Sequence, residues 1–123
     1  MIQLRSIVSI ADNSGARVGR VFKILGGSGR RYGRVGDIVV LSVQKAEPRK
    51  AIKKKDILQA VIVRSRSPLR RRDGSYVRFD ENAVVVLEKG KREPLAGRVF
   101  GPIPREIAEA GFQKIASLAM EIV

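Results

Sequence analysis

The arginines that follow a glycine-rich stretch are the residues of this sequence best suited to binding an anion. The stretch GGSGRRYG spans residues 26–33 and is followed by Arg34. Its glycines tolerate positive φ angles, so successive backbone N–H groups can converge on one anion. Arg30, Arg31 and Arg34 add forked donors that match phosphate oxygens, and Tyr32 can stack on a base or a ribose. A plain glycine hairpin loop explains the glycines alone but not the arginines, and the G-x-x-x-x-G-K-[ST] order of a nucleotide P-loop is missing.

Lysines dominate a second basic stretch, EPRKAIKKKD, at residues 47–56. It has a proline as its second residue and no regular pattern, which indicates a connection rather than a strand. Its long side chains would act as point charges on phosphates and confer affinity without sequence choice. The basic residues of this stretch are Arg49, Lys50, Lys53, Lys54 and Lys55.

A third basic stretch, SPLRRRDGSY, lies at residues 67–76. Strand alternation places Arg64 and Arg66 on one face of a strand that leads to it. Asp73-Gly74 favours a tight reversal, so the stretch predicts a hairpin tip that projects Arg70, Arg71 and Arg72 away from the body of the protein. A charge run is often no more than a solvated surface, and taken alone this one does not exclude that alternative.

Catalytic residues are scarce. The sequence has no histidine and no cysteine, which removes the commonest acid–base catalyst and the thiol nucleophile. Its only adjacent carboxylates are Asp80 and Glu81, and neighbours on a strand point to opposite faces, so they cannot easily share a proton or a metal. We therefore expect no enzyme activity, no metal site and no cofactor; a hydrolase or nuclease would need residues that are not there.

Net charge points to a polyanionic partner. Over 123 residues the formal charge is +13, and a compact body with that charge repels itself until a polyanion neutralises it. Residues 1–72 hold 18 Lys and Arg against 4 acids, a net of +14, and residues 73–123 hold 7 against 8, a net of −1. This asymmetry predicts a folded body with one anionic partner and a more neutral surface left for another contact.

Length and composition predict a single domain without a membrane span. A 44% hydrophobic content over 123 residues suffices for one core. Without cysteine no disulfide can form, and the N-terminal residues lack the basic-then-apolar pattern of a signal peptide. We expect a cytoplasmic protein.

Five apolar runs of strand length predict a mainly β fold. They are rich in β-branched residues and end at turn signals, with no helical pattern between them, which favours an antiparallel barrel or sandwich. In the last two runs, odd and even positions are both apolar, so the side chains on the two faces of each strand are apolar. Such runs suit strands that are covered on both faces. The five runs span residues 6–11, 20–25, 37–43, 57–64 and 83–87.

The C-terminal residues 104–123 change to helical spacing. Pro104 suits a first helical turn, Glu106 and Glu109 favour the dipole of that turn, and Gly111 interrupts the pattern. We expect two short helices that cap the barrel of residues 1–103. Aromatic residues are few, and we expect Phe22, Phe100 and Phe112 in the core, so recognition of folded, double-helical RNA by shape and phosphates fits better than base stacking. The residues of the helical pattern are Ile107, Ala110, Phe112, Ile115, Ala116 and Ala119.

Several motifs in collinear order resemble the bacterial-type family of large-subunit ribosomal protein fourteen. The family signature is matched by Ala60-Val61-Ile62-Val63, nine residues, Asp73-Gly74, four residues, Phe79, two residues, Asn82 and then Val85-Val86. ADNSGA (11–16), GGSGRRY (26–32), DGSYVRFDENA (73–83) and FGPIPRE (100–106) are also similar to that family. The resemblance covers essentially the whole chain.

The resemblance implies a small closed five-stranded antiparallel β-barrel with a projecting β-hairpin and a short C-terminal two-helix segment, as one domain over residues 1–123. It implies a structural constituent of the large ribosomal subunit that binds 23S-type rRNA and contributes to inter-subunit bridges with 16S-type rRNA. Neighbouring large-subunit proteins nineteen and three, and a ribosome silencing factor, are the implied protein partners, in a cytoplasmic or an organellar ribosome. Arg98 and Lys114 match the docking region of the silencing factor.

From the charge pattern and the resemblance together, we expect a broad rRNA-binding set and a small set for protein or bridge contacts, the latter being Arg98, Arg105 and Lys114. The alternative is a free small-barrel nucleic-acid chaperone or translation regulator that visits RNA transiently. The rRNA-binding set is Arg17, Lys23, Gly27, Ser28, Arg30, Arg31, Tyr32, Arg34, Arg49, Lys50, Lys53, Lys54, Lys55, Arg64, Arg66, Arg70, Arg71, Arg72 and Arg78.

Overall fold

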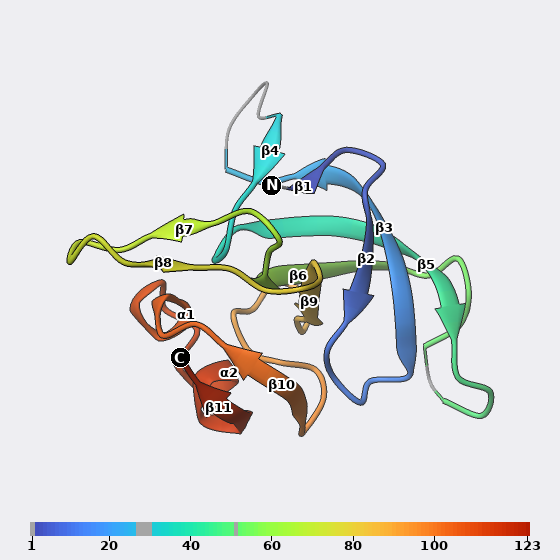
Figure 1. Ribbon diagram of the computed structural model, residues 1–123. Coiled ribbons are helices and arrows are strands. Elements are labelled where there is room, and N and C mark those ends of the chain that lie inside the picture. The colour runs from blue at the N-terminus through green and yellow to red at the C-terminus, as the bar shows by residue number, and fades with distance from the viewer. Residues whose placement is uncertain (1, 27–30, 51) are drawn as a thin grey trace.

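The computed structural model describes residues 2–26, 31–50 and 52–123, and its centre is a closed β-barrel (Figure 1). A two-stranded hairpin projects from one side of the barrel, and a C-terminal unit of two strands and two short helices packs below it (Figure 1). The elements, in chain order, are β1 (Ile2–Gln3), β2 (Ile7–Ile10), β3 (Ala16–Ile24), β4 (Tyr32–Gly33), β5 (Ile38–Ala46), β6 (Ile57–Arg64), β7 (Leu69–Arg70), β8 (Tyr76–Val77), β9 (Ala83–Val86), β10 (Val99–Ile103), α1 (Glu106–Glu109), α2 (Gln113–Leu118) and β11 (Ala119–Ile122).

Five strands close the barrel in the order β2-β3-β5-β6-β9, and these are the five apolar runs that the sequence predicts. Four of the strand pairs are antiparallel, but β2 and β9 close the ring in parallel, with Ser9 opposite Ala83. The fully antiparallel barrel of the prediction is therefore wrong at this seam. In a closed ring of five strands the direction cannot alternate all the way round, so one neighbouring pair has to be parallel.

β6 and β9 are covered on both faces, which confirms the prediction from their two-sided apolar runs. Ile62 and Val84 point into the barrel core, whereas Val61 and Val85 point to a second core beneath the C-terminal unit. All four side chains are fully buried. These two strands therefore form a common wall between the barrel and the C-terminal unit, and they fix one relative to the other.

The C-terminal segment is only partly helical. Ile107, Phe112 and Ile115 are buried at the predicted spacing, but the chain becomes extended at Ala119 and residues 119–122 form β11 instead of continuing α2. β11 runs parallel to β10, and the Val123 N–H donates to the Ile103 carbonyl at 3.0 Å. A neighbouring strand thus supplies the hydrogen bonds that a longer helix would have made internally. In the described residues, the helices are too short and too polar to cross a membrane.

Two of the three phenylalanines expected in the core lie on the surface. Phe112 is buried, but Phe22 and Phe100 are each 46% exposed. Phe22 sits at a register shift between the pairs of Val21 and Lys23, which turns its side chain outward. Phe100 follows the buried Val99 on β10 and points to the opposite face.

The hairpin forms as predicted. β7 and β8 are antiparallel, with Arg70 opposite Tyr76. Gly74 takes φ +89°, and the Asp73 carboxylate accepts hydrogen bonds from the Ser75 N–H and hydroxyl at 3.0 and 2.6 Å. Those bonds, together with the strand pairing, hold the tip in one conformation. The tip extends away from the barrel (Figure 1).

Candidate RNA interface

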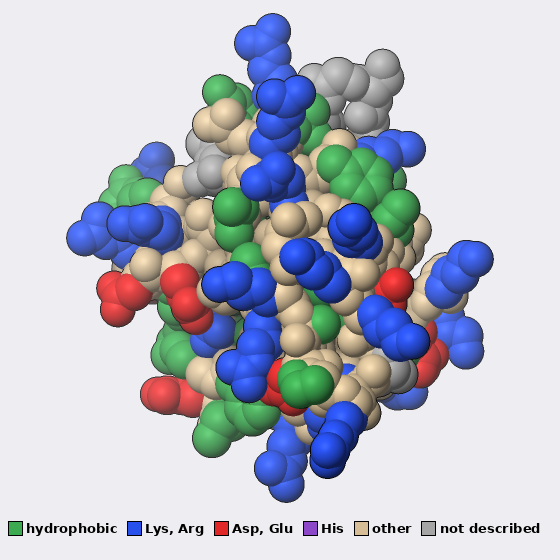
Figure 2. Space-filling model, turned by 90° about the vertical axis from the view of Figure 1, so that its right-hand side faces the viewer, with side chains coloured by type: hydrophobic (Ala, Val, Ile, Leu, Met, Phe, Trp, Pro, Cys, Tyr) green, Lys and Arg blue, Asp and Glu red, His purple; other side chains and the backbone are tan. Residues whose placement is uncertain are grey.

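Two basic segments of the expected rRNA-binding set, the loop that follows β5 and the hairpin, lie on separate sides of the barrel (Figure 1). The loop that follows β5 lies on the right of Figure 1, and the hairpin lies on the left. Figure 2 looks onto the right-hand side, where Lys and Arg side chains spread over the whole face and acids are few. The described members with exposed side chains are Arg17, Lys23, Arg31, Tyr32, Arg34, Arg49, Lys50, Lys53, Lys54, Lys55, Arg66, Arg70, Arg72 and Arg78.

The glycine-rich turn can be assessed only in part, because Gly27, Ser28 and Arg30 lie outside the described residues. Of the described part, Gly33 belongs to β4, which pairs with β1 against the barrel core. A Cβ atom at Gly33 would lie 2.7 Å from Ile62 Cδ1, so packing, rather than anion binding, explains this glycine. Arg31 and Arg34 flank β4 with exposed side chains.

The lysine-rich loop is more ordered than its irregular sequence suggests. The Asp56 carboxylate accepts a hydrogen bond from the Lys53 N–H at 2.9 Å, and the Lys55 N–H donates to the Val43 carbonyl at 2.7 Å. Arg49 and Lys55 adopt positive φ angles of 68° and 75°, which are uncommon for such residues. These hydrogen bonds hold the backbone around Lys53 and Lys55 beside β5.

The same loop meets the start of β3. Gly15 has φ +109°, and a Cβ atom there would lie 2.5 Å from the Cβ of Lys50, so only glycine permits this approach. A hollow between the two segments is lined by Arg17, Lys45 and four basic residues of the loop, Arg49, Lys50, Lys53 and Lys54. Arg17 also pairs with Glu47 at 2.9 Å. Distant basic residues of the sequence thus converge on one concave surface suited to a phosphate backbone.

Sequence reasoning missed the cations on the outer face of the barrel. Arg20 on β3 is exposed and lies between Ile7 of β2 and Ser42 of β5, and Ser42 in turn lies opposite Ile57 of β6. Ile7 and Ile57 are 57% and 67% exposed. The available signal was strand alternation, because Val21 and Ile24 point into the core and leave Arg20 outside.

Arg64 does not fit the expected role in RNA binding. Its side chain does not share a face with the exposed Arg66: Arg64 is only 7% exposed, and its Nη1 donates to the carbonyls of Phe100 and Pro102 at 3.0 and 3.4 Å. Nη2 lies 3.2 Å from a Glu81 carboxylate oxygen. A register shift between Ile62 and Arg64 at the end of β6 turns this side chain inward. Arg64 therefore joins the barrel to β10.

The electrostatics of Arg64 follow from that position. Burial lowers the pKa of Arg64 below its ordinary value, and the nearby Glu81 charge works in the opposite direction. Glu81 also accepts a hydrogen bond from the Ser9 hydroxyl at 3.2 Å. Asp80 and Glu81 lie in a bend rather than a strand, and Glu81 is occupied by these two partners. Within residues 2–26, 31–50 and 52–123, no cluster of Asp and Glu is suited to hold a metal ion.

Arg71 also points inward, unlike its neighbours. Its Nε and Nη2 donate to the two carboxylate oxygens of Glu106 at 2.7 and 3.2 Å, and Nη2 contacts the main-chain oxygen of Val123 as well. Partial burial acts to raise the pKa of Glu106, but hydrogen bonds from Arg71 and the charges of Arg71 and Arg105 outweigh it, so the pKa is lowered. Of the three hairpin arginines, Arg70 and Arg72 remain exposed and available to RNA.

The residues expected to contact proteins or a bridge lie in the C-terminal half with exposed side chains. Lys114 pairs with Glu93 at 2.9 Å, and this contact lowers the pKa of Glu93. The Arg98 N–H donates to the Asn13 side chain at 3.3 Å, and the Arg98 side chain is exposed. Arg105, by contrast, lines a hollow together with the three hairpin arginines. At this hollow the fold therefore brings a basic residue of the nearly neutral portion, residues 73–123, next to arginines of the basic portion, residues 1–72.

Asp12 is a buried carboxylate with a structural role. It accepts hydrogen bonds from the Ser14 N–H and hydroxyl at 3.1 and 2.6 Å, and from the Val86 N–H at 2.9 Å. Burial raises its pKa, although these hydrogen bonds pull in the opposite direction. Asp12 thus attaches the segment between β2 and β3 to β9, beside the parallel seam of the barrel.

Comparisons with known proteins show the family of this chain. The family described as "Ribosomal protein L14p/L23e" matches residues 1–123. The "Large ribosomal subunit protein uL14" of Petrotoga mobilis (strain DSM 10674 / SJ95) is 54% identical over 122 residues, which cover 99% of each chain. Both matches extend over essentially the full sequence, and both name a ribosomal component rather than an enzyme. The chain belongs to the ribosomal protein L14p/L23e family.

Proposed function

We propose that this protein is a structural constituent of the large ribosomal subunit that binds 23S-type rRNA through two ordered basic surfaces. The observation that carries the proposal is the lysine-rich loop, whose backbone is held by hydrogen bonds at Lys53 and Lys55 and whose basic side chains line one hollow with Arg17. A loop fixed before binding loses little entropy when it meets a phosphate backbone. The hairpin, with Arg70 and Arg72, supplies the second surface on the other side of the barrel (Figure 1).

Two basic surfaces on different sides suit a protein embedded among several RNA segments better than one lying on a single duplex. Each phosphate contact releases counterions, so the combined affinity is strong and depends on salt. The chain has only six aromatic residues, of which Phe22, Tyr32, Tyr76 and Phe100 are exposed. The exposed cations far outnumber them, which favours recognition of RNA shape and phosphates over base stacking. Arg98 and Lys114 are exposed and line neither the hollow of the lysine-rich loop nor that of the hairpin arginines, and we assign them to the neighbouring proteins nineteen and three, a bridge to 16S-type rRNA or a silencing factor.

Paired charge reversals test the RNA-binding surface. We expect K53E/K54E to lower the fraction of tagged protein that sediments with the large subunit, and to make the remaining association more sensitive to salt. K89E/K91E is the matched control, because it changes the net charge of the protein by the same amount at two exposed lysines in another loop. Equal losses from both variants would contradict the assignment. Wild-type protein in the light fractions would favour the transient chaperone.

Cross-linking in intact ribosomes tests the protein contacts. A photo-reactive residue at position 98 or 114 should give cross-links to neighbouring proteins or to small-subunit rRNA, whereas one at position 54 should give cross-links to large-subunit rRNA. Position 98 cross-linked only to large-subunit rRNA would contradict the proposed division between the surfaces.

A further inference from the structure

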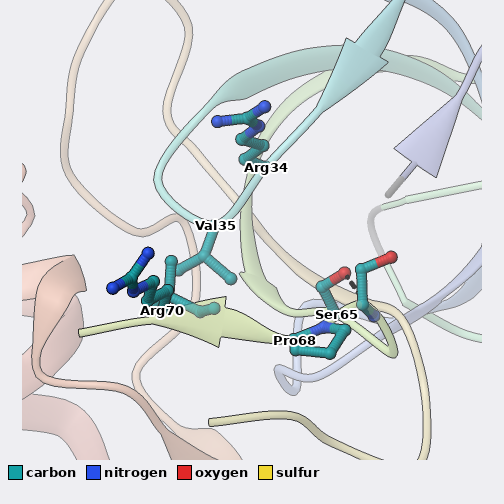
Figure 3. Close-up of a pocket in the computed structure, with 7 residues that line it drawn as sticks. Arg34, Val35, Ser65, Pro68 and Arg70 are labelled. Carbon is teal, nitrogen blue, oxygen red and sulfur yellow. Dashed lines mark hydrogen bonds between the residues drawn. The ribbon is translucent and has the colours of Figure 1, made fainter. Parts of the chain in front are cut away.

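A hollow between the turn at residues 34–36 and the base of the hairpin lies outside the lysine-rich surface. Its volume is about 310 Å³. Figure 3 shows Arg34 and Arg70 reaching it from different segments, with Val35 between them and Ser65 and Pro68 at the other end. The complete lining is Arg34, Val35, Ser65, Ser67, Pro68, Leu69 and Arg70.

Both walls of the hollow are held in place by hydrogen bonds. On one side, the Arg34 N–H donates to the Asp37 carboxylate at 2.7 Å, and the Gly36 N–H donates to the Ile62 carbonyl at 2.9 Å. On the other side, the Ser67 N–H donates to the Ser65 hydroxyl at 3.2 Å, and the Phe79 N–H donates to the Ser65 carbonyl at 3.0 Å. The hollow therefore exists before a ligand arrives.

The two arginines at its rim are uncommitted, in contrast to Arg17, Arg64 and Arg71, which pair with carboxylates. Across the described ranges, neither Arg34 nor Arg70 has an ion pair, and both are exposed. Two unpaired guanidinium groups beside one concavity call for an anion with several acceptor oxygens.

The other residues of the lining offer surface that a bare anion would not contact. Val35, Pro68 and Leu69 offer aliphatic surface that a bare phosphate would not use, and the Ser65 and Ser67 side chains are hydroxyl groups of the kind that bond a ribose or a base edge. Pockets of about 300 Å³ and above are those that hold small organic ligands. A phosphate, a sugar and a planar base in one ligand describe a nucleotide.

We propose that this hollow accepts one unpaired nucleotide of the large-subunit rRNA, with its phosphate against Arg34 and Arg70 and its base on Val35 and Pro68. This inference rests on the proposed function, because the RNA must already lie against the hairpin. Unstacked bases in loops and bulges are the usual targets of proteins that recognise RNA at single positions. The two segments that form the hollow are far apart in sequence, so the site exists only in the folded chain.

Nucleotide-resolution probing of the rRNA in large subunits tests this inference. Subunits assembled with R34A/R70A and with S67F, which fills the hollow without removing charge, are treated with a reagent that acylates flexible 2′-hydroxyl groups. We expect the same one or two nucleotides to become about tenfold more reactive in both variants, because a held nucleotide is released. K89A/K91A, which removes the same charge as R34A/R70A from a loop outside both basic surfaces, should leave those nucleotides unreactive.

The outcomes separate the inference from the function on which it rests. Normal incorporation of R34A/R70A with an unchanged reactivity profile would overturn the nucleotide site and leave rRNA binding intact. Failure of the wild-type protein to enter large subunits would overturn the proposed function itself. Titration of the isolated full chain with adenosine 5′-monophosphate distinguishes the source of the ligand: saturable NMR shifts at Val35 and Leu69, combined with unchanged rRNA reactivity, would assign the hollow to a free nucleotide and refute the RNA site.

Discussion

The guanidinium group of Arg71 meets the carboxylate of Glu106 side-on, with Nε 2.7 Å from Oε1 and Nη2 3.2 Å from Oε2. Arg71 belongs to the hairpin and Glu106 begins α1, so this pair joins the projecting hairpin to the C-terminal unit that packs on the barrel. The most basic segment of the sequence is thereby oriented by one of its own arginines, while Arg70 and Arg72 stay exposed.

Removal of Arg71 should loosen the hairpin without unfolding the barrel. In R71A, Glu106 loses its partner and the hairpin keeps its short strand pairing and the Asp73–Ser75 bonds of its tip. We expect amide hydrogen exchange at position 71 and at Gly74 to accelerate about tenfold. Barrel amides such as that of Ile62 should not change. R72A, which removes a neighbouring exposed arginine, is the control, and equal acceleration in that variant would refute the role of the pair.

The Arg71–Glu106 pair should also depend on pH. The folded-state pKa of Glu106 lies below its ordinary value of 4.5, so the pair's contribution to stability is complete above about pH 4.5 and is lost as the pH falls through the folded-state pKa. The difference in melting temperature between wild type and E106Q should therefore be largest at neutral pH and shrink on acidification. Buried Asp12, whose pKa is raised, acts in the opposite direction in both proteins and cancels in the comparison. A constant difference across this range would exclude Glu106 as the titrating group.

Replacement of Arg64 should destabilise the whole fold. R64L leaves the Phe100 and Pro102 carbonyls without this donor and Glu81 without its cation, which we expect to lower the free energy of unfolding by about 2–4 kcal/mol. R66L, two residues further along, changes an exposed arginine and should cost no more than about 0.5 kcal/mol. Urea denaturation of the two variants provides the measurement, and similar midpoints would contradict the structural role of Arg64.

Glycine at position 101 is required by the same contact. Gly101 has φ +79°, and a Cβ atom there would lie 2.0 Å from Arg64 Nη1. We expect G101A to cost about 1–3 kcal/mol in thermal or urea unfolding, through backbone strain and displacement of the guanidinium group. Gly97 provides the control, because a Cβ atom there meets nothing within 4 Å. In the R64L background the cost of G101A should fall, since the guanidinium group that it displaces is gone.

Local residue patterns determined the strands, the turns and the family. β-Branched runs ending at Gly, Asp and Pro marked all five barrel strands, because backbone and side-chain preferences act within a few residues. The two-sided apolar runs at Val61–Val63 and Val84–Val86 similarly indicated strands buried on both faces. The charge total indicated a polyanionic partner, and the spacing of the signature motifs identified the family that the comparisons show.

Tertiary structure alone decided which basic residues are free to bind RNA. Arg64 and Arg66, or Arg71 and Arg72, are equivalent in a local pattern, but one of each pair is claimed by a partner from the C-terminal unit. The same long-range packing drew residues 119–122 into a strand beside β10 and brought Arg34 to Arg70. A guanidinium group pairs with whatever carboxylate or carbonyl the folded chain places beside it, and that neighbour is set by the path of the whole chain rather than by the adjoining residues.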